Sequence, residues 1–366
     1  FDATRLANKA TAALRAYDPG HDLAALRALH GDRLAELGSN ENPLGPSPVA
    51  LAAMHAALAD AFRYPDPKGI SLKRALATQL GVDVASLALG NGSHELLMLS
   101  AQCFADASTS VVFSEFGFAV FPIATAAAGA HAIRVPALPR DHATAPYGHD
   151  LDALAAAVRA DTRIVYLANP NNPTASWFAL DELEALFERV PTRTLVVVDE
   201  AYHEYIDATG PRSALALIDR YPNLIVTRTF SKAHALAGLR VGYAIAHASV
   251  IAVIERLRES FNVNGIALAA AEASLADHGH LEHVRDWTCR ERAWLAGELV
   301  KRGYRVLRSQ TNFLLVDLGV DAAPLEAHLL ESAVIVRPMG GYGLAHTLRI
   351  SIGSRAENER LLAALP

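Results

Sequence analysis

A single lysine, Lys232, stands among small hydroxyl residues in the stretch TRTFSKAHALAGLRVGY, residues 227–243. The run before it is apolar, which places the lysine at the end of a buried strand. Removal from water makes the charged form of an amine costly and lowers its pKa. A neutral amine is a nucleophile toward an aldehyde. Lys232 taken alone could equally be a solvated surface lysine, so its interpretation depends on its companions.

Those companions are polar residues that follow other apolar runs. They are Gly92, Ser93 and His94 after SLALG, Asn172 after IVYLA, Asp199 and Tyr202 after LVVV, and Thr229 and Ser231 after LIVT. In open parallel sheets, ligands bind beyond the carboxyl ends of the strands. We therefore expect these side chains to meet Lys232 in one crevice.

This set of side chains matches the groups of one cofactor. Asp199 can keep a pyridine nitrogen protonated, while Tyr202 and Asn172 can hydrogen-bond a phenolate oxygen. Ser231, Arg240 and the helix start in GNGSHE can form a cup for a phosphate. An aldehyde, a pyridine nitrogen, a phenolate and a phosphate together describe pyridoxal 5'-phosphate, which enzymes hold by a lysine and an acidic partner of the ring nitrogen.

The elements that must position these residues follow from the apolar pattern. Continuous apolar runs alternate with helical stretches, which predicts an α/β fold with a mostly parallel sheet sandwiched by helices. The last hundred residues instead combine a long helical region with short strands, NFLLVDL, VIVRPMG and TLRISIG, and predict a smaller α+β domain. We predict an N-terminal arm over 1–36, a large cofactor-binding domain over 37–260 and a small domain over 261–366.

Composition narrows the class of protein. The chain has 366 residues, and 51% of them are hydrophobic, as in an ordinary globular enzyme. The net charge of −6 argues against nucleic-acid or membrane-surface partners. The Ala-rich tracts are interrupted by charges, so we expect no membrane span. Two cysteines far apart do not make a disulfide framework. We expect a cytoplasmic protein with small-molecule substrates.

Two other motifs are weaker. The histidines of HGHLEH, residues 278–283, lack the carboxylate or cysteine pattern that would complete a metal site, so we expect no metal. LGNG is not the full dinucleotide fingerprint, which disfavours a nicotinamide enzyme.

Several segments taken together resemble a known family. SNENPLGPSP, RYPD, ANPNNPT, VVVDEAYHEY, TFSKAHALAGLRVGY and LRISIG are similar, in order and spacing, to the fold-type-I aminotransferases, and within them to the histidinol-phosphate aminotransferase family. The similarity runs from about residue 14 to the C-terminus. It implies a homodimer that uses pyridoxal phosphate to exchange an amino group between L-histidinol phosphate and 2-oxoglutarate, by a ping-pong route through pyridoxamine phosphate in histidine biosynthesis.

The resemblance also implies a role for each matching residue. Lys232 resembles the Schiff-base lysine that shuttles the proton, Asp199 the partner of the pyridine nitrogen, and Tyr202 with Asn172 the pair on the ring oxygen. The phosphate would be held by Ser231, Arg240, Thr229, Ser93, His94 and, from the neighbouring subunit, Tyr64. Phe116 matches the aromatic residue that stacks on the ring. Arg349 matches the carboxylate clamp, and Tyr17 and Arg337 match positions near the distal end of the substrate.

The sequence departs from the family pattern at four positions. Phe116 stands where tyrosine is common, and His94 where an acidic residue or asparagine is common. Ala175 stands where glycine is common, and His234 where an aromatic or similar residue is common. Because one fold serves many substrates, an aromatic amino-acid aminotransferase for phenylalanine or tyrosine is an alternative. A lyase of the threonine-phosphate decarboxylase type and a cofactor-binding regulator without turnover are the others.

Overall fold

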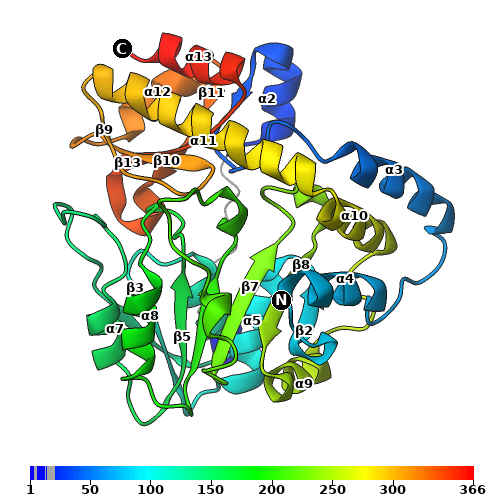
Figure 1. The fold of residues 1–366 in the computed structure, drawn as a ribbon. Helices are drawn as coiled ribbons and strands as arrows, with labels where there is room; N and C mark the ends of the chain where they lie inside the picture. Colours follow the sequence, from blue (N-terminus) through cyan, green and yellow to red (C-terminus); the bar gives the residue numbers. More distant parts are fainter. Residues whose placement is uncertain (4–5, 13, 15–20) are drawn as a thin grey trace.

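The computed structural model describes residues 1–3, 6–12, 14 and 21–366, and these form two layered bodies (Figure 1). The larger body is built on a seven-stranded sheet. In spatial order its strands are β2 (Leu87–Gly90), β8 (Gly242–Ala246), β7 (Leu224–Thr229), β6 (Leu195–Asp199), β5 (Thr162–Ala168), β3 (Ser110–Ser114) and β4 (His131–Val135). Strand β8 runs antiparallel to both of its neighbours, and the other described pairs are parallel.

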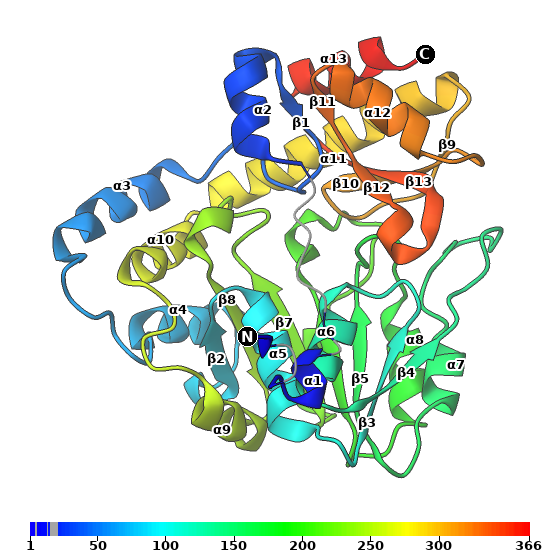
Figure 2. The ribbon, with the colours of Figure 1, turned by 180° about the vertical axis from the view of Figure 1, so that it is seen from behind.

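Helices cover both faces of this sheet, because its strands carry apolar side chains on both faces. Along β5, Ile164 and Tyr166 belong to one buried cluster, whereas Val165 and Leu167 belong to another, as the two-residue period of a strand requires. One face is covered by α5 (Ser93–Phe104), α6 (Val120–Ala127) and α9 (Ala248–Leu257). The other is covered by α4 (Ile70–Leu80), α7 (Leu151–Ala156), α8 (Leu180–Phe187) and α10 (Gly265–Ala276) (Figures 1 and 2). The predicted α/β class with a helix-sandwiched, mostly parallel sheet is confirmed.

The smaller body lies above the carboxyl ends of the central strands in Figure 1. Its sheet has the order β12 (Arg337–Met339), β13 (Leu344–Ser351), β10 (Phe313–Asp317) and β9 (Arg305–Val306). Helices α11 (His278–Lys301), α12 (Ala323–Glu331) and α13 (Arg355–Ala364) pack on it around a separate apolar core. Strands β12 and β13 of this body carry Arg337 and Arg349, which face the large body.

The N-terminal part of the chain contributes to both bodies. Strand β1 (Ala35–Glu36) pairs in parallel with β11 (Val334–Ile335) of the smaller body, next to α2 (Leu23–His30). The following helix α3 (Pro48–Ala57) packs against α10, and α1 (Lys9–Ala12) lies beside α6. The domain limits at residues 36 and 260 stay a prediction. Within the described ranges, no helix is both long and apolar enough to cross a bilayer.

Candidate active site

A cavity of about 380 Å³ lies between the two bodies, beyond the carboxyl ends of β5, β6 and β7. It brings together eleven of the residues that the sequence singled out. They are Ser93, His94, Asn172, Asp199, Tyr202, Thr229, Ser231, Lys232, Arg240, Arg337 and Arg349. The large body contributes the first nine, and the last two come from strands of the smaller body. The crevice expected from the strand ends is therefore present.

Lys232 lies in the turn after β7 and projects into this cavity. Its Nζ donates to the backbone oxygen of Asn40 at 3.2 Å and lies 5.8 Å from the centre of the Tyr202 ring. Burial, and then the nearby cation of Arg349, lower the pKa of Lys232 to about 8. The lowered pKa raises the fraction of neutral amine near neutral pH well above that of an ordinary lysine, and the neutral form is the one that acts as a nucleophile or a proton acceptor.

Asp199 ends β6 and is 4% exposed. Its Oδ1 accepts a hydrogen bond from the Thr227 hydroxyl at 2.7 Å. Burial raises the pKa of Asp199 to about 7 even though this hydrogen bond and the Lys232 cation act in the opposite direction. A buried carboxyl group in this state gains from a cationic partner placed beside it, because such a partner stabilises the ionised form.

Two arginines on the smaller body complete the cavity. Arg337 on β12 is paired with Arg349 on β13, so the two cations are direct neighbours across the strands. Like charges opposite each other destabilise a sheet unless an anion binds between them or near them. Arg349 is 9% exposed and donates to Asn172 Oδ1 and to the backbone oxygen of Gly38, both at 2.7 Å. The guanidinium of Arg349 thus holds the loop of Asn172 to the smaller body.

The opposite end of the cavity resembles an anion cup. Gly92 caps the N-terminus of the twelve-residue α5 with φ +83°, which leaves Ser93 and His94 in the first turn. Arg240 Nη1 donates to Ser231 Oγ at 3.1 Å, and the Thr229 hydroxyl donates to the same oxygen at 2.9 Å. Helix N-termini and guanidinium groups both favour anions. Burial and the Arg240 cation lower the pKa of His94, so its ring is neutral.

Gly92 shows how closely this cup is built. A Cβ on Gly92 would lie 2.5 Å from Arg240 Nη2, which is closer than real Cβ contacts. The positive φ of Gly92 disfavours a side chain as well. The glycine therefore lets the arginine lie directly against the start of the helix.

Of the three remaining predicted site residues, two lie outside this cavity and one is not among the residues that the structure describes. Phe116 is not among the described residues that line the cavity, although Phe118 and Ala119 are. The ring of Phe116 packs edge-on against the ring of Tyr147, with 5.8 Å between the ring centres. Its stacking role stays a prediction. Tyr64 is 83% exposed and stacks on Phe261 at 4.7 Å, away from this cavity. Tyr17 lies outside the described residues.

The sequence reasoning missed three residues of the site. Asn40 Nδ2 donates to the Tyr202 hydroxyl at 2.9 Å, and Thr227 on β7 donates to Asp199. Thr227 stands two residues before Thr229 in TRTFSKAHALAGLRVGY, which is a usable signal, whereas Asn40 in SNENPLGPSP has no predicted site residue beside it. Tyr342, which accepts from the backbone N–H of Ala119 at 3.1 Å, stands in GGYG, where nothing in the sequence marks it.

A second cavity of about 570 Å³ adjoins the first. Ser39, Arg337 and Tyr342 belong to both walls, so the two spaces are contiguous. Its lining also includes Arg134 and a hydrogen bond between His21 Nε2 and Glu326 Oε1 at 2.7 Å. The combined space can hold an elongated, polar molecule.

Comparison with known proteins agrees with this geometry. Residues 33–365 match the family of class I and II aminotransferases. Histidinol-phosphate aminotransferase 1 of Thiobacillus denitrificans is 46% identical over 96% of the chain and 91% of that relative. Histidinol-phosphate aminotransferase 2 of Pseudomonas aeruginosa is 46% identical over 100% of the chain and 98% of that relative.

A solved structure gives the same answer for the fold. The histidinol-phosphate aminotransferase of Sinorhizobium meliloti, determined with pyridoxal-5'-phosphate, superimposes with a TM-score of 0.88. It is 34% identical and covers 98% of this chain, which in turn spans 95% of that structure. The family match covers residues 33–365 of the chain, and the cavity has the expected composition. The chain therefore belongs to the class I and II aminotransferases, enzymes of fold type I that use pyridoxal phosphate.

Proposed function

We propose that this aminotransferase exchanges the amino group of L-histidinol phosphate with 2-oxoglutarate, a step of histidine biosynthesis. The observation that carries the proposal is the pair Arg337 and Arg349, opposite each other on adjacent strands at the cavity. A ping-pong enzyme for this reaction takes a phosphate ester and a dicarboxylate in turn at one site. Two adjacent guanidinium groups can bind either anion, because each can donate paired hydrogen bonds to two oxygens of a carboxylate or of a phosphate. The relatives named above support the same substrate.

The side chains present fit pyridoxal phosphate, which when bound supplies an electron sink for the α-carbon of the substrate. We assign the raised-pKa carboxyl of Asp199 to the pyridine nitrogen, since a protonated ring nitrogen would keep that carboxyl ionised. Tyr202 and Asn172 would hold the ring oxygen. The anion cup described above would hold the phosphate through Ser231, Arg240, Thr229 and the first backbone N–H groups of α5 at Ser93 and His94.

Lys232 would hold the cofactor and then move a proton at the α-carbon of the substrate. Its pKa of about 8 supports both tasks, because the amine must be neutral to react and near the working pH to exchange a proton. Arg349 would clamp the carboxylate of glutamate, and Arg337 would bind the distal anion. The water-poor walls of the cavity, such as Met339 and Phe118, would keep these charge contacts strong.

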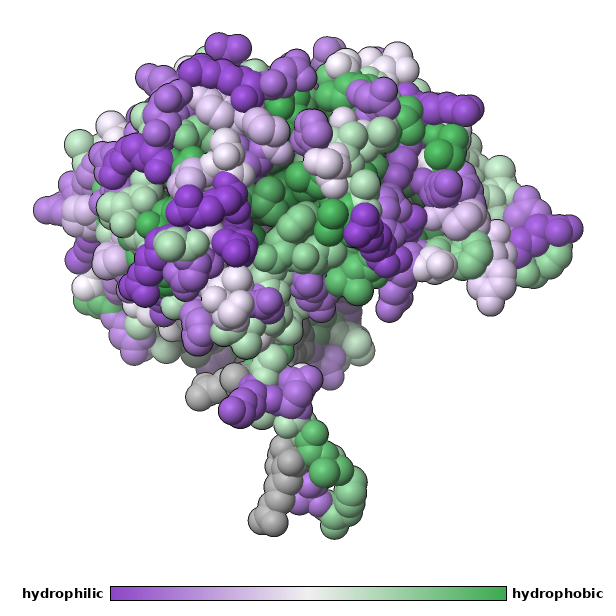
Figure 3. Space-filling model, turned by 90° about the horizontal axis from the view of Figure 1, so that it is seen from below, coloured by the Kyte–Doolittle hydropathy of each residue, from purple (hydrophilic) through white to green (hydrophobic). Residues whose placement is uncertain are grey.

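We further propose that the active enzyme is a homodimer. Leu58, Phe62 and Tyr64 are 54%, 77% and 83% exposed and lie where the chain projects from the body after α3. Figure 3 shows this projection on the right and α1 projecting below. Exposed apolar side chains gathered on one segment indicate a protein interface. Because Tyr64 lies away from the cavity of its own chain, we assign it to the phosphate of the neighbouring subunit.

The two cysteines support a location in the cytoplasm. Cys103 and Cys289 are both free and half-buried. Free thiols are typical of a reducing compartment. We therefore propose that the enzyme works in the cytoplasm, as a biosynthetic aminotransferase would.

Steady-state kinetics test the substrate. The enzyme is assayed with 2-oxoglutarate and either L-histidinol phosphate or L-phenylalanine as donor, and kcat/KM is compared. We expect a higher kcat/KM for L-histidinol phosphate than for L-phenylalanine. Arg337→Gln should lower kcat/KM for L-histidinol phosphate more than it lowers kcat/KM for L-phenylalanine. A higher kcat/KM for L-phenylalanine would make the protein an aromatic aminotransferase, and carbon dioxide released from threonine phosphate would make it a lyase.

A further inference from the structure

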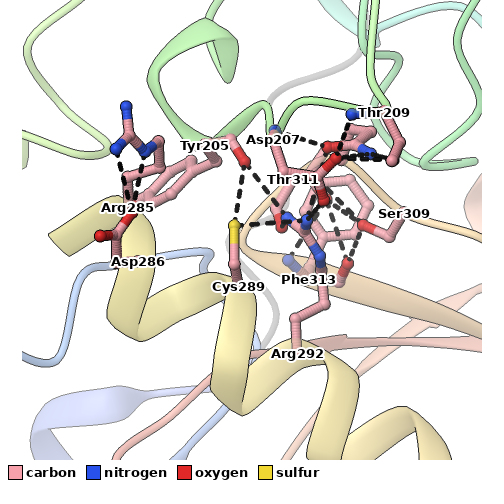
Figure 4. Close-up of polar contacts among 11 residues, drawn as sticks. Tyr205, Asp207, Thr209, Arg285, Asp286, Cys289, Arg292, Ser309, Thr311 and Phe313 are labelled. Carbon is pink, nitrogen blue, oxygen red and sulfur yellow. Dashed lines mark hydrogen bonds and ion pairs between the residues drawn. The ribbon is translucent and has the colours of Figure 1, made fainter. Parts of the chain in front are cut away.

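Arg292 is a buried cation outside the cavity, on the long helix α11. It is 6% exposed and points from the helix into a junction of two loops (Figure 4). Its guanidinium donates to the backbone oxygen of Thr311 at 2.8 Å and to Asp207 Oδ2 at 3.1 Å. Longer contacts reach the backbone oxygen of Tyr205 and the side chain of Gln310, each at 3.4 Å. A guanidinium with this many acceptors is well suited to fix loops relative to each other.

The two loops are also joined directly. The side chain of Gln310 donates to Asp207 Oδ1 at 3.0 Å and to the Thr209 hydroxyl at 3.1 Å, and its oxygen accepts from the Asp207 backbone N–H at 3.0 Å. Asp207 belongs to the larger body, in the segment that follows Tyr202, while Gln310 belongs to the smaller body, just before β10. Arg292 therefore lies at the centre of a polar junction between the two bodies.

Both loops continue into the active site. From the first loop, the Tyr202 ring lies edge-on against the ring of Phe313 at 5.2 Å. In the second loop, Asn312 Nδ2 donates to the backbone oxygens of Asn40 and Glu41 at 3.0 and 3.2 Å. Asn40 in turn donates to the Tyr202 hydroxyl and accepts from Lys232 Nζ. Each of the two loops that Arg292 joins therefore leads to Tyr202 and Lys232.

We propose that Arg292 is a positioning residue that sets Tyr202 and Asn40 around Lys232, and so fixes the environment of the reactive amine. Removal of Arg292 leaves the Tyr205–Asp207 and Thr311–Phe313 segments without their shared donor. Asn40 then loses its contact with Asn312 and keeps those with Ser351, so it shifts relative to Tyr202 and water reaches Lys232. This inference rests on the proposed role of Lys232 as the amine that holds the cofactor, and not on the identity of the amino donor.

The test compares three variants of the protein. Arg292→Leu removes every hydrogen bond of the guanidinium and leaves the direct contacts between Gln310 and Asp207. Asp207→Asn removes the ion pair while the carbonyl contacts of Arg292 remain. The control is Glu291→Gln, on the adjacent residue of α11. Glu291 is equally buried, at 6% exposed, and accepts hydrogen bonds from Arg355 within the smaller body. It therefore matches Arg292 in burial and in having a charged partner, but it has the opposite charge and no connection to Tyr202.

Two readouts are measured, neither of which requires a turnover assay. The first is the pH dependence of the rate at which cofactor-free protein takes up pyridoxal phosphate, which reports the pKa of Lys232. The second is the dissociation constant of the cofactor. For Arg292→Leu we expect the apparent pKa to rise toward the ordinary lysine value and the cofactor to bind about tenfold more weakly, a change of about 1.4 kcal/mol. Asp207→Asn should shift both values in the same direction by less.

The control decides between positioning and general stability. If Glu291→Gln lowers the melting temperature but leaves the pKa and the dissociation constant unchanged, Arg292 acts through the site. An unchanged Lys232 pKa in both Arg292→Leu and Asp207→Asn, or an equal shift in Glu291→Gln, would overturn the proposal. Asp207→Asn decides the question if Arg292→Leu fails to fold. Donor preference is measured separately on the unaltered enzyme, so failure of the histidinol-phosphate assignment would not be confused with failure here.

Discussion

Replacing Asp199 by asparagine should stabilise the cofactor-free protein while it abolishes activity. Burial raises the pKa of Asp199 from 3.8 to about 7 in the folded chain. The folded state therefore binds this proton more tightly than the unfolded state does, and folding loses stability as the pH rises from about 4 to about 7. The pKa difference corresponds to about 4 kcal/mol of lost stability above that range. Because the buried amide of asparagine still costs about 1–3 kcal/mol, we expect a net gain of about 1–3 kcal/mol.

The assay is thermal unfolding of cofactor-free protein at several pH values. A gain of about 1–3 kcal/mol corresponds to a melting temperature several degrees higher for Asp199→Asn at about pH 8. The difference should shrink toward about pH 4, where both forms are neutral. An equal or lower melting temperature for the variant at about pH 8 would refute the reasoning, since it would mean that the carboxyl is not strained by burial. Thr227→Val, which removes the hydrogen bond to Asp199, is the matched control and should destabilise at high pH.

Three further substitutions test separate parts of the site. Lys232→Ala should fold as a dimer but should hold no pyridoxal phosphate after borohydride reduction, as mass spectrometry of the protein would show. Gly92→Ala should weaken cofactor binding by about tenfold or more, measured by equilibrium titration, because its Cβ would displace the Arg240 guanidinium and backbone strain costs about 1–3 kcal/mol. Arg349→Ala should raise KM for glutamate and for 2-oxoglutarate by about thirtyfold or more, since charged hydrogen bonds contribute about 1.5–3 kcal/mol each, while the bound cofactor keeps its absorption spectrum.

Much of the fold could be predicted because its signals are local. The strands LVVVD and LIVTRT are fully buried and carry continuous apolar runs, and both were expected as strands with polar residues at their carboxyl ends. The parallel arrangement then gathered Asp199, Thr229 and Lys232 in one cavity. Strand β4 could not be predicted in this way, because HAIRV lies at the edge of the sheet, has exposed residues and lacks a continuous apolar run.

Contacts between distant segments could not be predicted in the same way. The hydrogen bond from Asn40 to Tyr202 joins residues 162 positions apart, and the one from Arg349 to Asn172 joins residues 177 apart. Such pairs depend on how the smaller body closes over the sheet, which no local pattern records. The edge-on contact of Phe116 with the Tyr147 ring is a further example, since nothing in the sequence indicates it, and the stacking role of Phe116 on the cofactor stays a prediction. The site residues at the ends of the strands could therefore be predicted from the sequence. The contacts between distant loops could not.

A single-turnover half-reaction tests the central claim most directly. The purified enzyme, loaded with pyridoxal phosphate, is mixed with L-histidinol phosphate in the absence of any keto acid, and the absorption band of the bound cofactor is followed. We predict rapid loss of that band, formation of one equivalent of the keto product per site, and recovery of the band when 2-oxoglutarate is added. A band that is unchanged by L-histidinol phosphate but lost with L-phenylalanine would contradict the proposed substrate, and a protein that shows no band after loading would contradict the assignment of Lys232.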